Sequence, residues 1–101
     1  LMNIGKALQR IRFEKGMNQN HVAKKAKISQ TYLSLLEQGK KKDPSREVIK
    51  KLCKVYDIPP AVVSWYAVEE SDVPQRKKET FLKVKPVIDG LVQQLLTPNN
   101  K

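Results

Sequence analysis

The sequence is short of several residue types, and each shortage excludes a class of protein. Its 101 residues include one cysteine, Cys53, and one histidine, His21, which excludes an internal disulfide and a zinc site built from two Cys and two His. Its apolar stretches are short runs such as Ala61-Val62-Val63, far below the roughly 18 residues that a transmembrane helix needs. We therefore expect a protein of the reducing cytoplasm with no membrane span.

The sequence also lacks the motifs that carry catalysis. It has no Gly-rich phosphate loop, no pair of carboxylates with a supporting histidine and no cluster of metal ligands. Cys53 lies among apolar residues at helical spacing, which favours a small core residue over a redox sensor. We expect no enzymatic activity, no cofactor and no metal.

Acidic residues are scarce relative to basic ones. The chain has 20 Lys and Arg against 10 Asp and Glu, a formal net charge of +10. Residues 1–68 carry 14 of the basic residues and 5 of the acidic ones, whereas the remainder is nearly balanced. Such a one-sided charge on one part of a small protein is typical of nucleic-acid binding.

What the sequence does contain is a succession of short helical patterns. N-cap residues precede the first three patterns and prolines precede the next two: Asn3, Asn18 and Ser29, then Pro44 and Pro59. The second and third helices are predicted over residues 19–26 and 30–38, with Gly39 as the stop after the third. No stretch alternates with a period of two, so the predicted fold is all-α.

The predicted second and third helices are joined by residues 27–29 alone, so they must cross steeply. The small side chain of Ala23 permits the close approach that this crossing requires. The outward side of the third helix carries uncharged polar residues that can hydrogen-bond to base edges or phosphates: Gln30, Thr31, Ser34 and Gln38.

Several spaced motifs occur in a familiar order. They are Glu14-Lys15-Gly16-Met17-Asn18-Gln19, Val22-Ala23, Ile28-Ser29-Gln30, Leu36-Glu37-Gln38-Gly39-Lys40 and Pro44-Ser45. On these motifs, residues 3–68 resemble the lambda-repressor-like, Xre-type helix-turn-helix family. The resemblance implies a five-helix domain whose third helix reads the major groove of double-stranded DNA. Lys27 stands where the family often has glycine, so we expect it to adopt a left-handed conformation.

The resemblance also implies which residues touch DNA. The base-reading residues are expected to be Gln30, Thr31, Ser34 and Leu35. The phosphate-binding residues are expected to be Arg12, Gln19, Tyr32, Gln38, Lys40, Lys41 and Lys42. Leu35 stands where the family often has a polar or basic residue, and it either meets thymine methyl groups or lies at the rim. Arg12 is also expected to pair with Glu37 and so to tie the first helix to the third.

An acidic linker over residues 69–74 separates this domain from a C-terminal helical segment over residues 75–97. Within this segment, apolar residues recur at helical spacing and form one stripe: Phe81, Val84, Ile88, Leu91 and Leu95. The stripe predicts dimerisation, with completion of the monomer's own core as the alternative. Pro86 predicts a kink, or two segments near residues 74–84 and 86–97.

Together these features predict a sequence-specific transcriptional regulator, a repressor, that binds double-stranded DNA as a homodimer. The alternative is an antitoxin-like protein. Its C-terminal segment would bind a partner protein while the helix-turn-helix represses its own operon.

Overall fold

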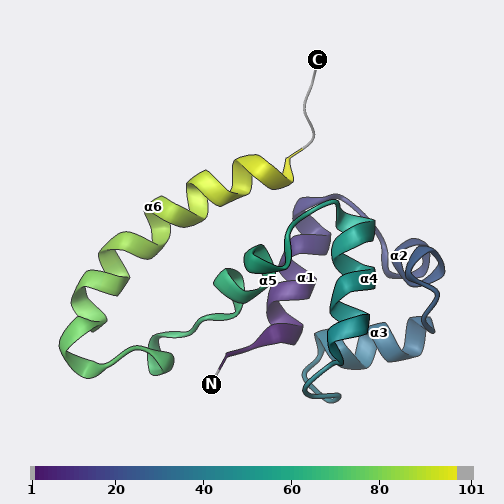
Figure 1. Cartoon of the computed structure of the whole chain (residues 1–101), viewed down its shortest axis with the longest axis horizontal. Coiled ribbons are helices and arrows are strands. Elements are labelled where there is room, and N and C mark those ends of the chain that lie inside the picture. The colour runs from purple at the N-terminus through teal and green to yellow at the C-terminus, as the bar shows by residue number, and fades with distance from the viewer. Residues whose placement is uncertain (1, 98–101) are drawn as a thin grey trace.

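A computed structural model describes residues 2–97 of the chain, and every regular element among them is helical (Figure 1). The elements are α1 (Ile4–Glu14), α2 (Gln19–Ala26), α3 (Gln30–Glu37), α4 (Arg46–Tyr56), α5 (Pro60–Ala67), two 3₁₀ turns (Glu70–Asp72 and Gln75–Lys77) and α6 (Lys78–Leu96). The predicted all-α fold is confirmed. We call α1 to α5 the body of the molecule.

Local capping places the helix starts where the sequence predicts them. The side chains of Asn3, Asn18, Ser29 and Ser45 each accept a hydrogen bond from the backbone N–H three residues later, at 3.0, 2.8, 3.0 and 3.2 Å. Pro59 is the N-cap of α5 and Pro60 its first residue. Helix α3 ends at Glu37, one residue earlier than predicted, with Gln38 as its C-cap.

The body has one apolar core to which all five of its helices contribute. Its completely buried side chains include Leu8, Ile11, Val22, Leu33, Leu52, Tyr56 and Val63. Cys53 is buried in the same cluster, as expected, and this burial raises the pKa of its thiol.

Of the two outcomes predicted for Pro86, a kink or two segments, the division into two segments is wrong, because Lys78 to Leu96 form a single helix with Pro86 inside it. Proline has no N–H to donate to the carbonyl of Leu82 one turn earlier. Both residues are exposed, so water can replace the missing donor and the helix continues. The axis of α6 bends along its length (Figure 1).

Helix α6 leaves the body through the two 3₁₀ turns and returns to it at its C-terminal end (Figure 1). Leu96, in its last turn, has no exposed surface and belongs to the core of the body, with Val92 packed against that core. The ring of Phe81 lies 6.5 Å from the ring of Trp65 in α5. One side of α6 therefore completes the monomer.

A polar cluster also holds α6 on the body. The carboxylate of Asp89 accepts hydrogen bonds from Trp65 Nε1 at 2.7 Å, from Lys85 Nζ at 3.1 Å and from Arg10 Nη1 at 3.3 Å. Burial by itself raises the pKa of Asp89. The hydrogen bonds from Trp65 and Lys85, with the charges of Lys85 and Arg10, outweigh that effect and leave the pKa lowered. We call these four residues the Asp89 cluster.

Within residues 2–97 no helix is both long and apolar enough to span a bilayer.

Candidate nucleic-acid interface

The turn between α2 and α3 has the tight geometry that the short connection predicts. Lys27 adopts the left-handed conformation, with φ 59° and ψ 43°, as expected for a residue in a glycine-like position. The N–H of Ile28 donates to the carbonyl of Ala23 at 3.0 Å, which closes the end of α2. Ala23 is 2% exposed, so the two helices meet over a methyl group.

A second close approach was not expected from the sequence. A Cβ atom on Gly5 would overlap the carbonyl oxygen of Leu36, so glycine at this position lets α1 touch the backbone of α3. The signal available in the sequence was only a glycine within a helical pattern. This contact sets the depth at which the last turn of α3 sits against α1.

The predicted pair between Arg12 and Glu37 is confirmed, and it is buried. Arg12 Nε and Nη2 donate to the two carboxylate oxygens of Glu37, each at 2.8 Å, in a bidentate arrangement. Arg12 Nη1 donates to the carbonyl of Met17 at 3.0 Å. The hydrogen bond to Glu37 raises the pKa of the guanidinium further, against the opposing effect of burial.

Hydrogen bonds continue from this buried pair to the surface of α3. Gln19 Nε2 donates to Glu37 Oε1 at 3.0 Å, and Gln30 Nε2 donates to Gln19 Oε1 at 2.8 Å. Gln30 is exposed and retains its side-chain carbonyl oxygen and its second amide proton. An amide with one donor and one acceptor free can pair with adenine in the major groove. The chain from Arg12 to Gln30 therefore presents a prearranged amide to solvent.

The residues predicted to read bases lie together on the outer side of α3. Gln30 and Thr31 are exposed, and Ser34 and Leu35 one turn later are partly exposed. Gln38 Nε2 donates to Ser34 Oγ at 2.7 Å and extends this polar row to the end of the helix. The inward side of the helix is formed by Leu33 and Leu36, which are buried.

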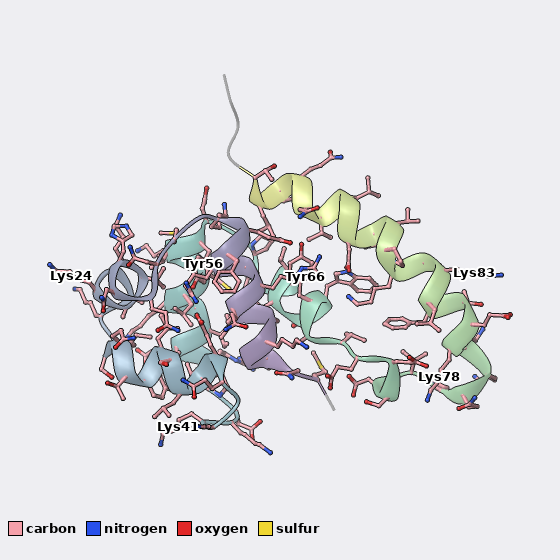
Figure 2. The ribbon with its side chains drawn as sticks, turned by 180° about the vertical axis from the view of Figure 1, so that it is seen from behind. Lys24, Lys41, Tyr56, Tyr66, Lys78 and Lys83 are labelled. Atoms are coloured by element: carbon pink, nitrogen blue, oxygen red, sulfur yellow. The ribbon has the colours of Figure 1, made fainter. Side chains whose placement is uncertain are left out.

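The basic loop after α3 is folded against the end of that helix. The backbone N–H groups of Lys40 and Lys41 both donate to the carbonyl of Leu35, at 2.9 and 3.2 Å. Gly39, at φ 77°, makes this reversal possible. The three lysine side chains, Lys40 to Lys42, are exposed, and Lys41 points away from the body beyond α3 (Figure 2).

The residues expected to bind phosphate differ in their accessibility. Gln38 and the three lysines are exposed, and Gln19 and Tyr32 are partly exposed. Arg12 is 7% exposed, and each of its guanidinium nitrogens already donates a hydrogen bond within the protein. Its position gives it a structural role in the buried pair.

Comparison with known families agrees with this geometry. The Helix-turn-helix family model matches residues 8–63, from the first turns of α1 into α5. The chain belongs to the helix-turn-helix family. Within that family it is of the lambda-repressor-like, Xre type, whose members are DNA-binding regulators. No curated protein matches the chain significantly.

Proposed function

We propose that this helix-turn-helix protein is a sequence-specific transcriptional repressor that inserts α3 into the major groove of its operator. The observation that carries the proposal is the hydrogen-bonded chain from Arg12 through Glu37 and Gln19 to the exposed amide of Gln30. A side chain whose orientation is set before DNA arrives loses less entropy when it pairs with a base. The lysines after α3 then supply contacts to the sugar-phosphate backbone that do not depend on sequence.

Base reading is tested by selecting bound sequences from a random DNA pool and then comparing variants on the selected site. Gln30→Ala and Ser34→Ala should each weaken binding to that site by about 1–3 kcal/mol while leaving binding to random DNA nearly unchanged. The matched controls are Gln75→Ala and Ser64→Ala, which remove the same side chains from exposed positions outside α3. Equal losses on selected and random DNA would reject the assignment of these residues to base reading.

The protein acts as a homodimer through the uncovered side of α6. Of the five residues predicted to dimerise, Phe81 and Ile88 are partly covered by the monomer, whereas Val84, Leu91 and Leu95 are exposed. Val87, outside the predicted set, is 63% exposed. The α6 stripe therefore consists of Val84, Val87, Leu91 and Leu95, which fall on one side of the helix at spacings of three, four and four.

A second copy of the chain is the occupant that fits this stripe. A single recognition helix contacts one half-site, and a two-fold dimer places two such helices about 34 Å apart, one turn of DNA. Charge favours an antiparallel pair of α6 helices. The first half of α6 carries Lys78, Lys83 and Lys85 against the single acid Glu79, while residues 90–96 carry no charge. An antiparallel pair sets each basic half against an uncharged one.

Dimerisation is tested by replacing both Val87 and Leu91 with Asp, because two charges on the stripe would have to be desolvated in any interface. Sedimentation should show a dimer for the intact chain and a folded monomer for this variant. The control is Leu82→Asp, since Leu82 is 53% exposed on α6 but lies away from the stripe. An intact chain that is monomeric at micromolar concentration, or that forms a stoichiometric complex with a different protein, would reject the homodimer. The latter outcome would favour the antitoxin-like alternative.

A further inference from the structure

Four lysines surround one hollow on a part of the body that base reading does not use. The hollow, of about 530 Å³, lies between the C-terminal end of α2 and one side of α4. Its lining consists of Lys25, Lys27, Lys51, Lys54, Ala26 and Val55. None of these residues belongs to α3 or to the loop that follows it. We call this feature the lysine hollow.

The fold brings these lysines together from two stretches of sequence. Lys25 lies in the last turn of α2, and Lys27 is the left-handed residue of the following turn. Lys51 and Lys54 are three residues apart in α4, so they project from neighbouring positions on one side of that helix. Because α2 packs on α4, the two pairs face the same space.

The charges of the lysine hollow are not balanced by nearby acids. All four lysines are exposed, and none forms an ion pair with any residue that the structure describes. Lys54 also borders a neighbouring hollow, which Lys50 and Asp57 line, without forming an ion pair with that aspartate. Four like charges around one space repel one another, and a bound polyanion would relieve that repulsion.

The composition of the lining favours nucleic acid over protein as the polyanion. Lysine is depleted at protein–protein interfaces, which depend on buried aromatic and arginine anchors. The lysine hollow offers no aromatic side chain and no arginine. Lysine ammonium groups are instead the usual partners of phosphates in binding that does not depend on sequence.

We propose that the lysine hollow is a second phosphate-binding surface, which holds the phosphodiester backbone of nucleic acid without reading its sequence. It is separate from the loop of Lys40 to Lys42. Its lining comes from the end of α2, the turn after it and α4, whereas that loop follows α3. The backbone that it holds comes either from DNA flanking the operator or from a second duplex.

The test compares two variants of the full chain that lose the same charge. Lys51→Ala with Lys54→Ala removes half of the charge of the lysine hollow, and Arg76→Ala with Lys77→Ala removes two exposed basic residues elsewhere. The probe is a duplex of random sequence, and the measured quantity is the slope of log affinity against log salt concentration. Affinity falls as salt rises, so the slope is negative, and each lost phosphate contact should make it shallower by about 0.9.

We expect the slope of the lysine-hollow variant to be shallower than that of the intact chain by about 1.8, while the control variant keeps the slope of the intact chain. Between 50 and 200 mM salt, the lysine-hollow variant should therefore lose about tenfold less affinity than the intact chain. Equal slopes for the two variants would overturn the proposal. Thermal unfolding should show that both variants are folded, because all four residues are exposed.

Two further arms of the experiment identify the source of the phosphates. If flanking DNA is held, lengthening a selected operator duplex should strengthen binding of the intact chain but not of the lysine-hollow variant. If a second duplex is held, the intact chain bound to an immobilised operator should retain a labelled random duplex and the variant should not. The random-sequence slope needs no operator, so it remains readable even if sequence-specific binding fails.

Discussion

The body and α6 bury their apolar residues to very different extents. In the body nearly every large apolar residue of α1 to α5 is covered, with Phe13 the clear exception at 63% exposed. In α6, Leu96 is completely buried while its neighbour Leu95 is 62% exposed. The body is thus a nearly closed core that Leu96 completes, whereas the α6 stripe of Val84, Val87, Leu91 and Leu95 stays exposed in the monomer.

The two regions also differ in how polar groups are used. The body encloses the bidentate pair of Arg12 and Glu37, whose side chains are 9% and 0% exposed. Helix α6 is held by the Asp89 cluster, in which the side chain of Arg10 is 39% exposed. Removing one member of a buried pair leaves an uncompensated charge. In a partly hydrated cluster, water can take the place of a lost hydrogen-bond partner. The body should therefore be the less tolerant of substitution.

The largest effect is expected inside the body. Arg12→Ala leaves the carboxylate of Glu37 buried with Gln19 as its one remaining side-chain donor among residues 2–97, and should lower the free energy of unfolding by about 3–5 kcal/mol. Denaturant unfolding of Arg12→Ala, Glu37→Ala and the double variant measures this cost and the coupling between the residues. Additive effects in that cycle would contradict a direct pair.

Two adjacent leucines of α6, Leu95 and Leu96, test which side of this helix belongs to the core of the body. Leu96→Ala should lower the free energy of unfolding by about 2–4 kcal/mol, because it opens a cavity in the core. Leu95→Ala should change the stability of the monomer by less than about 0.5 kcal/mol, while weakening self-association. Unfolding at a concentration where the chain is monomeric separates the two effects. Equal costs would show that α6 does not complete the core through Leu96.

The Asp89 cluster predicts a pH dependence of smaller size. Because the folded chain lowers the pKa of Asp89 below its ordinary value of 3.8, its contribution is present above that pH. The contribution is lost as the pH falls through the lowered value. Asp89→Asn should therefore cost about 1–2 kcal/mol at pH 7 and flatten the loss of stability below pH 4.

Thermal unfolding at pH 7 and pH 3 measures this dependence. The control is Glu79→Gln, which removes an exposed carboxylate of α6 that forms no ion pair with the described residues. If Asp89→Asn loses as much stability between pH 7 and pH 3 as the intact chain does, other carboxylates cause that loss.

The smallest effect concerns backbone strain, which is confined to the body. Among the described residues, every position with positive φ lies in the body, and Lys27 is one of three that are not glycine. Lys27→Gly should raise the free energy of unfolding by about 1 kcal/mol, since glycine adopts this conformation without steric cost. Lys24→Gly, inside α2, should lower it by about 1 kcal/mol. Chemical denaturation of both variants would show opposite signs, and a loss of stability in both would contradict strain at Lys27.

The sequence by itself determined the helix starts and the composition of the reading face. A cap such as Ser29 is satisfied by an N–H only three residues away, so no distant part of the chain can alter it much. The placement of Gln30, Thr31 and Ser34 on one side of α3 follows from the 3.6-residue period together with the burial of Leu33. The pair of Arg12 and Glu37 could be predicted only because the family resemblance placed the first helix next to the third.

Only the tertiary structure decided how α6 is used, because its contacts join residues far apart in the chain. The apolar stripe predicted from the sequence includes Leu95 and not Leu96, yet packing on the body buries Leu96 and leaves Leu95 exposed. Arg10 and Asp89 are 79 residues apart, so no local pattern relates them. Pro86 stays within a helix because its missing hydrogen bond faces water, and solvent exposure is a property of the folded chain.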